Sequence, residues 1–77
     1  MHWVSFFDHT KKFYFGGFAS AEAAEAACFV TDYNGASRDC RQETRRNGPY
    51  SIIQADDPPN KIAASNLWEA VKRAKRY

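Results

Sequence analysis

Bulky apolar residues recur among polar ones over the first eighteen positions, as expected of β-strands. The segments "HWVSFFD" (2–8) and "KFYFGGF" (12–18) are rich in aromatic and β-favouring residues, and polar "HTKK" lies between them. This pattern predicts a β-hairpin with a loop of four residues or fewer. A register that pairs Phe6 with Phe15 puts large rings on both faces of the hairpin. One face then carries Val4, Phe6, Phe13 and Phe15, and the other carries Trp3, Phe7, Tyr14 and Phe18.

A helix is expected directly after the double glycine of this hairpin. Ser20 is a favoured N-cap residue, and Glu22 and Glu25 fall in the first turns, where the helix dipole favours negative charge. The pair Asn34-Gly35 has the composition of a C-cap, so the helix is predicted to end there.

Two rings of this predicted helix lie away from its alanine-rich face. Phe29 and Tyr33 are four residues apart, which makes them neighbours on the side where solvent-facing residues are expected. The small alanines on the opposite face allow the helix to approach a sheet closely. We therefore predict that Phe29 and Tyr33 contact a partner.

Residues 35–50 have two interpretations. A short helix capped by Ser37 would carry several arginines on one face. Alternatively, residues 41–44 form a strand that turns through "RRNG" into the next strand. The Asn47-Gly48 turn signal favours the loop and strand.

The C-terminal part of the chain predicts a strand, a break and a helix. The strand is "YSIIQ" (50–54), and the break is "ADDPPN" (55–60), where two prolines exclude strand and helix interiors. The helix is predicted over 63–76. Its start can be as late as Asn66, because Glu69 three residues on would complete a capping box.

These elements predict a single α+β domain over residues 1–77. It is a small antiparallel sheet with two helices, in the order β-β-α-(loop or strand)-β-α. A chain of 77 residues buries only about 60% of its unfolded surface, and its six Phe, two Trp and four Tyr residues partly offset this limit. A sheet covered on one face by two helices needs apolar residues on that face only. The additional rings must be covered by the second helix, by residues 35–48, by a second copy or by a partner.

Charge is nearly balanced but unevenly distributed. The net charge is +2: two lysines against four acidic residues give −2 over residues 1–33, and nine basic against five acidic residues give +4 over residues 34–77. This asymmetry permits an acidic partner without requiring one. A group of arginines near Tyr50 has three interpretations. It could bind phosphates, or it could bind carboxylates on an acidic protein surface. Alternatively, it forms a solvated loop whose charge is partly neutralised by Asp39 and Glu43. Its members are Arg38, Arg41, Arg45 and Arg46.

The stretch "FYFGGFASAEAAEAA" resembles the passage from sheet to helix in AP2-type DNA-binding domains and in the related integrase arm-binding domains. The matching residues are Gly16 or Gly17, Phe18, Ser20, Glu22, Ala23 and Ala24. The resemblance implies a ββα shape, which in those families places the sheet in the DNA major groove. The passage is also similar to the Gly-x-Phe-x-Ser step of peptidoglycan-binding SPOR domains. AP2-type domains have three strands before the helix and arginines on them, whereas this hairpin carries no arginine, so shape is implied more than DNA reading.

The sequence offers no constellation typical of catalysis or metal binding. Cys28 and Cys40 are too few for a disulfide framework, although a single bridge between them stays open. His2 and His9 are isolated, and no spacing suits a metal. We expect no enzyme activity, no cofactor and no metal. The start "MHWVSFF" lacks a basic leader and no segment has membrane-spanning length, so a cytoplasmic location without a membrane partner is expected.

We predict a non-enzymatic binding protein that docks on a macromolecule. A protein partner is favoured because basic residues are interleaved with acidic ones. The alternative is a nucleic-acid-binding module of AP2/integrase-arm type that also uses Lys11, and a homodimer is possible. Stand-alone binding proteins of this size include phage-encoded inhibitors of host machinery, such as anti-CRISPR proteins, and this class is suggested without a supporting motif. The predicted contact residues are Trp3, Tyr14, Phe29, Tyr33, Arg38, Arg41, Arg45 and Arg46.

Overall fold

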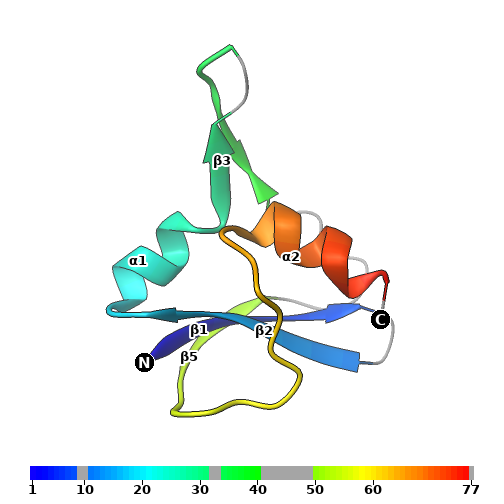
Figure 1. Ribbon diagram of the computed structural model, residues 1–77. Helices are drawn as coiled ribbons and strands as arrows, with labels where there is room; N and C mark the ends of the chain where they lie inside the picture. Colours follow the sequence, from blue (N-terminus) through cyan, green and yellow to red (C-terminus); the bar gives the residue numbers. More distant parts are fainter. Residues whose placement is uncertain (9–10, 32–33, 41–49, 77) are drawn as a thin grey trace.

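The computed structural model describes residues 1–8, 11–31, 34–40 and 50–76 of the chain (Figure 1). Its elements are β1 (His2–Asp8), β2 (Lys11–Phe18), α1 (Ala21–Ala26), β3 (Phe29–Thr31), β4 (Ser37–Asp39), β5 (Ser51–Gln54) and α2 (Leu67–Ala74). An antiparallel sheet has the strand order β2-β1-β5, and β3 and β4 form a second, two-stranded sheet. The predicted α+β class, with a small antiparallel sheet and two helices, is confirmed.

The N-terminal hairpin has the predicted faces but a different register. Phe6 lies opposite Phe13, and Val4 lies opposite Phe15. The predicted pairing of Phe6 with Phe15 is therefore wrong by two residues. Side chains alternate with a period of two, so an even shift leaves each on its own face. All four are buried, as that face requires.

A bulge at the double glycine moves Phe18 to the core side of the sheet. The register shifts between His2, which pairs with Phe18, and Trp3, which pairs with Gly16. The two glycines have φ of +131° and +80°, which side chains rarely adopt. The extra residue reverses the alternation. Phe18 therefore packs edge-on against Phe15, with ring centres 6.0 Å apart, and its predicted place beside Trp3 is wrong.

The first helix begins where predicted and ends much earlier. The Ser20 hydroxyl accepts a hydrogen bond from the backbone N–H of Ala23 at 3.1 Å, which confirms the N-cap. The helix ends at Ala26, so the prediction that it reaches Asn34 is wrong. The reason is local, because an aromatic and two β-branched residues at 29–31 favour a strand.

The sheet of β3 and β4 is a ribbon that rises from the helix side of the molecule (Figure 1). Thr31 pairs with Ser37, and Asn34-Gly35 lies in the connection between the strands. Gly35 has a φ of +83°, as hairpin connections often require. The helix predicted from Ser37 is wrong over residues 37–39, which are β4. The predicted strand over 41–44 and the turn at Asn47-Gly48 lie outside the described residues.

Two cysteines lie opposite each other in the chain pairing at the base of this ribbon. The backbone N–H of Cys40 donates to the carbonyl of Cys28 at 2.8 Å. Neither cysteine is in a disulfide, both are fully buried, and the Cys28 thiol donates to the carbonyl of Ala24 at 3.7 Å. They anchor the ribbon in the main core, since small apolar thiols pack well in interiors.

The core lies between the three-stranded sheet and the two helices, which cover the same face of it (Figure 1). The rings of Phe6 and Phe13 stack with centres 5.9 Å apart. The N–H of Leu67 donates to the carbonyl of Ala27 at 2.8 Å, which joins the start of α2 to the end of α1. The buried apolar residues are Val4, Phe6, Phe13, Phe15, Ala24, Cys28, Cys40, Ile62, Leu67, Ala70, Val71 and Ala74.

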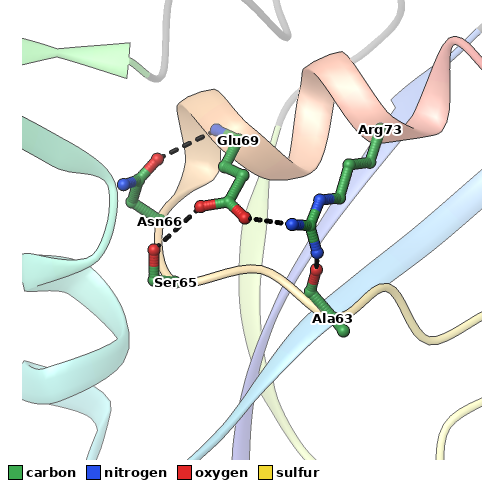
Figure 2. Close-up of polar contacts among 5 residues, drawn as sticks. All are labelled: Ala63, Ser65, Asn66, Glu69 and Arg73. Carbon is green, nitrogen blue, oxygen red and sulfur yellow. Dashed lines mark hydrogen bonds and ion pairs between the residues drawn. The ribbon is translucent and has the colours of Figure 1, made fainter.

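The second helix starts at the later of the two predicted positions. The Asn66 side chain accepts a hydrogen bond from the N–H of Glu69 at 2.9 Å. The Glu69 carboxylate accepts from the Ser65 hydroxyl at 2.9 Å and pairs with Arg73 at 2.6 Å (Figure 2). Arg73 also donates to the carbonyl of Ala63. This network fastens the incoming chain to the first turns of the helix.

The connection between β5 and α2 passes beneath the sheet, on the side away from the helices (Figure 1). It then follows the outer edge of β2. The N–H of Tyr14 donates to the carbonyl of Asn60 at 3.2 Å, and the N–H of Ile62 donates to the carbonyl of Tyr14 at 2.8 Å. Pro58, within the predicted break, is buried. The break thus covers part of the sheet, a form of cover that the sequence did not suggest.

Candidate functional site

The sheet face turned away from the helices carries aromatic side chains around one lysine. Strand alternation fixes its members, because each lies opposite a residue of the neighbouring strand whose side chain points the same way. We call this surface the outer face. Its side chains are those of Trp3, Ser5, Phe7, Lys12, Tyr14, Ser51 and Ile53.

Lys12 lies at the centre of the part of the outer face nearest the hairpin end. Its ammonium nitrogen is 5.6 Å from the ring centre of Phe7, which it faces across the strand pair, and 5.6 Å from that of Tyr14. Both distances suit cation–π attraction. All three side chains are half-buried. The arrangement holds one positive charge between two rings at the surface.

Ser5 lies on the outer face of β1, opposite Tyr14 of β2 and Ser51 of β5, and its side chain links β1 to β5. It is only 1% exposed, and its hydroxyl oxygen is 2.6 Å from that of Ser51. The same hydroxyl donates to the Ser51 carbonyl at 3.3 Å. A buried hydroxyl is tolerated only when it is hydrogen-bonded, so this contact allows a polar residue beneath the rings.

Trp3 occupies the other end of the outer face. Its indole N–H donates to the carbonyl of Ala55 at 2.9 Å. The Trp3 ring also lies close to β2, because a Cβ added at Gly17 of that strand would be 3.6 Å from it. The side chain therefore lies across the sheet, between the end of β5 and β2. Trp3 is half-buried, and Ala55, which accepts from its indole N–H, is the first residue of the connection between β5 and α2. This end of the outer face is thus covered in part by the chain itself.

The structure separates the predicted contact residues. Trp3 and Tyr14 share the outer face. Phe29 lies on β3 on the helix side, where it packs half-buried against the core, so its predicted solvent-facing position on a helix is wrong. Arg38 is in β4 opposite Val30. The remaining four, Tyr33, Arg41, Arg45 and Arg46, lie outside the described residues.

Phe7, Lys12 and Ile53 lie on the outer face but were not in the predicted contact set. Phe7 was placed on the correct face by alternation but was not taken as a contact. Lys12 was read as part of the polar turn, although it stands two residues from Tyr14 and so shares its face. Ile53 lies opposite Trp3, and only the pairing of β1 with β5 reveals this.

A second surface of interest lies along α2. A depression of about 340 Å³ is formed there, and the ammonium of Lys72 lies 5.9 Å from the ring centre of Trp68. Arg73 is held by Glu69, whereas Lys75 and Arg76 are exposed. The described residues that line the depression are Asn66, Trp68, Glu69, Lys72, Arg73 and Arg76.

Over residues 1–8, 11–31, 34–40 and 50–76, no group of three or more His, Cys, Asp or Glu side chains is placed to hold a metal ion. Neither of the two described helices is long and apolar enough to cross a membrane.

Comparisons with known protein families, with curated proteins and with solved structures find no match to this chain. The similarity of residues 13–27 to AP2-type domains stays a prediction.

Proposed function

We propose that this chain is a non-enzymatic binding protein whose outer face docks on a protein partner. One observation supports the proposal most strongly: the charge of Lys12 is held between the rings of Phe7 and Tyr14 on the sheet face that the helices leave uncovered. Strand backbone positions these groups, so little ordering is needed when a partner binds.

The chemistry of the outer face suits a protein better than a polyanion. Aromatic side chains are enriched at protein interfaces and often provide most of the binding energy. Among the described residues of this face, Lys12 carries the positive charge, so a phosphate backbone would find one cation there. A carboxylate of a partner would instead pair with Lys12 while apolar groups around it cover the two rings. The expected partner surface is an acidic residue within an apolar patch.

The experiment compares proteins captured from the native host by wild type and by two variants. The first variant replaces two outer-face rings, Phe7→Ser with Tyr14→Ser. The matched control replaces two exposed residues of α1, Ala21→Ser with Glu22→Ser. Quantitative mass spectrometry measures capture, and circular dichroism checks that all three proteins are folded.

We expect wild type and control to enrich the same partner, and the outer-face variant to lose about tenfold or more of it, as removal of two interface rings implies. Equal capture by all three folded proteins would refute docking through the outer face. The class of phage-encoded inhibitors is compatible with such docking and stays a prediction.

A second candidate function is nucleic-acid binding through α2. The observation that favours it is the group of exposed basic residues Lys72, Lys75 and Arg76 next to Trp68. Binding of a fluorescent DNA or RNA oligonucleotide should then weaken steeply with salt, with a logarithmic slope of about −2.7 for three phosphate contacts. The same binding should be lost when all three residues are replaced by Gln. A flat salt dependence, or binding unaffected by this triple change, would exclude the candidate.

A further inference from the structure

The two outer edges of the three-stranded sheet differ in how their backbone groups are satisfied. On β2, the outward N–H of Tyr14 donates to the carbonyl of Asn60, and the Tyr14 carbonyl accepts from the N–H of Ile62. The Asn60 side chain also donates to the carbonyl of Lys12 at 3.2 Å. The chain therefore covers this edge of its own sheet, as proteins commonly do to prevent unwanted pairing.

The edge formed by β5 is different. Met1 and Ala55 exchange hydrogen bonds in both directions, at 3.0 and 3.3 Å. In an antiparallel pair such bonds recur at every second residue, so Ile53 also faces β1. The backbone groups of Ile52 and Gln54 consequently point away from the sheet. Within the described part of the chain, no hydrogen bond reaches them from that side.

We propose that β5 pairs antiparallel with β5 of a second copy of this chain, about a two-fold axis at Ile53. In that register, Ile52 of one copy exchanges backbone hydrogen bonds with Gln54 of the other. Every outward N–H and C=O of these two residues is then satisfied in both copies. The sheets of the two copies join into one continuous sheet.

The sequence of β5 fits a second copy in this orientation. Edge strands are usually protected by a charge, a proline or a bulge, and "SIIQ" contains none of these. The nearest charge is on Asp56, which is exposed just beyond the end of β5. Antiparallel pairing places Asp56 opposite Tyr50 of the second copy and keeps the two Asp56 carboxylates at opposite ends. A parallel pair would bring these carboxylates together, which is unfavourable.

Side chains support the same register. The Ile53 side chains of the two copies become direct neighbours on the outer face, in the closer type of antiparallel pair. Ile53 is half-buried in the single copy, so each covers apolar surface of the other. The two outer faces then adjoin. The pairing does not depend on the proposed protein partner, because it uses the edge of the sheet.

A proline at position 54 tests the pairing directly. Gln54→Pro removes an outward N–H that has no role within the single copy, and the exposed side chain it replaces is outside the core. Gln54→Thr is the matched control, because it keeps the N–H and favours strands. Thermal unfolding verifies that both variants are folded, and sedimentation equilibrium measures association of each full-length protein.

We expect wild type and Gln54→Thr to form dimers with similar dissociation constants. Gln54→Pro should raise the dissociation constant about tenfold or more, because both symmetric hydrogen bonds are lost. In a mixture of isotope-labelled and unlabelled wild type, a filtered nuclear Overhauser effect should connect the Hα atoms of Ile53 in the two copies. A chain that is monomeric up to about 1 mM overturns the proposal, as does a dimer unaffected by Gln54→Pro.

Discussion

Lys12 lies directly opposite Phe7 in the β1–β2 pair, with its ammonium 5.6 Å from the centre of that ring. The next residue along β2, Phe13, points the other way and lies in the core. The hairpin thus has two chemically different faces. One packs against the helices, and the other presents a lysine framed by rings.

Neighbouring ring residues on β2 should differ sharply in their effect on stability. Phe13 is 2% exposed, so Phe13→Ala should lower the free energy of unfolding by about 3–5 kcal/mol. Tyr14 is half-buried on the outer face, so Tyr14→Ala should cost only about 1–2 kcal/mol. Urea denaturation measures both. Equal losses would show that the outer face is as important for folding as the core.

Phe29 should contribute to stability rather than to partner binding. The sequence predicted the reverse, but Phe29 packs against the core from β3. Phe29→Ala should lower the free energy of unfolding by about 2 kcal/mol, which corresponds to a melting temperature roughly 8–16 °C lower. Capture of the partner by the folded variant should be unchanged. An unaltered melting temperature together with lost capture would restore the original prediction.

Two glycines with positive φ should respond differently to alanine. A Cβ at Gly16 would lie 2.5 Å from ring atoms of Phe18, whereas a Cβ at Gly35 meets no atom within 4 Å. Gly35→Ala should therefore cost only the backbone penalty of about 1–2 kcal/mol. Gly16→Ala should cost at least about 1 kcal/mol more, because the ring must also move. Thermal unfolding of both variants measures this, and equal costs would argue against the bulge geometry.

The cap of α2 should be worth more than the ion pair beside it. Asn66→Ala removes the acceptor for the N–H of Glu69 and should cost about 1 kcal/mol, whereas Asn66→Asp keeps an acceptor. Glu69→Gln weakens the partly exposed pair with Arg73 and should cost about 0.5 kcal/mol or less. Chemical denaturation compares the three. A larger loss for Glu69→Gln than for Asn66→Ala would contradict this ranking.

Alternation along the hairpin was sufficient to predict the two faces but not the register. Shifting Phe6 from Phe15 to Phe13 changes no face, so the hydrophobic pattern contains no information that separates these registers. Phe18 was assigned to the wrong face because strict alternation along a strand takes no account of the extra residue that a bulge inserts.

The end of α1 was predicted wrongly because local signals conflict. The alanine-rich pattern continues past Ala26, whereas Phe29–Thr31 favours a strand and Asn34-Gly35 also suits a hairpin. The strand forms because Ser37–Asp39 pairs with it, and this partner is a tertiary feature.

Only part of the candidate site was accessible from the sequence. Alternation of side chains along the two strands was sufficient to place Trp3 and Tyr14 on the same face. Lys12 was counted both as the first residue of the predicted strand and as part of the polar turn, whereas the strand begins at Lys11 and Lys12 lies within it. The cover given to the sheet by residues 55–62 depends on the path of the connection in space, which composition does not encode.

The most direct measurement of the central claim is site-specific photo-crosslinking in the native host. A photoreactive phenylalanine analogue is placed at Phe7 on the outer face or, as control, at the exposed Glu22 of α1. We predict that position 7 forms a covalent adduct with one dominant protein and that position 22 does not. Adducts of equal yield at both positions, or none at position 7 while position 22 reacts, would contradict docking through the outer face.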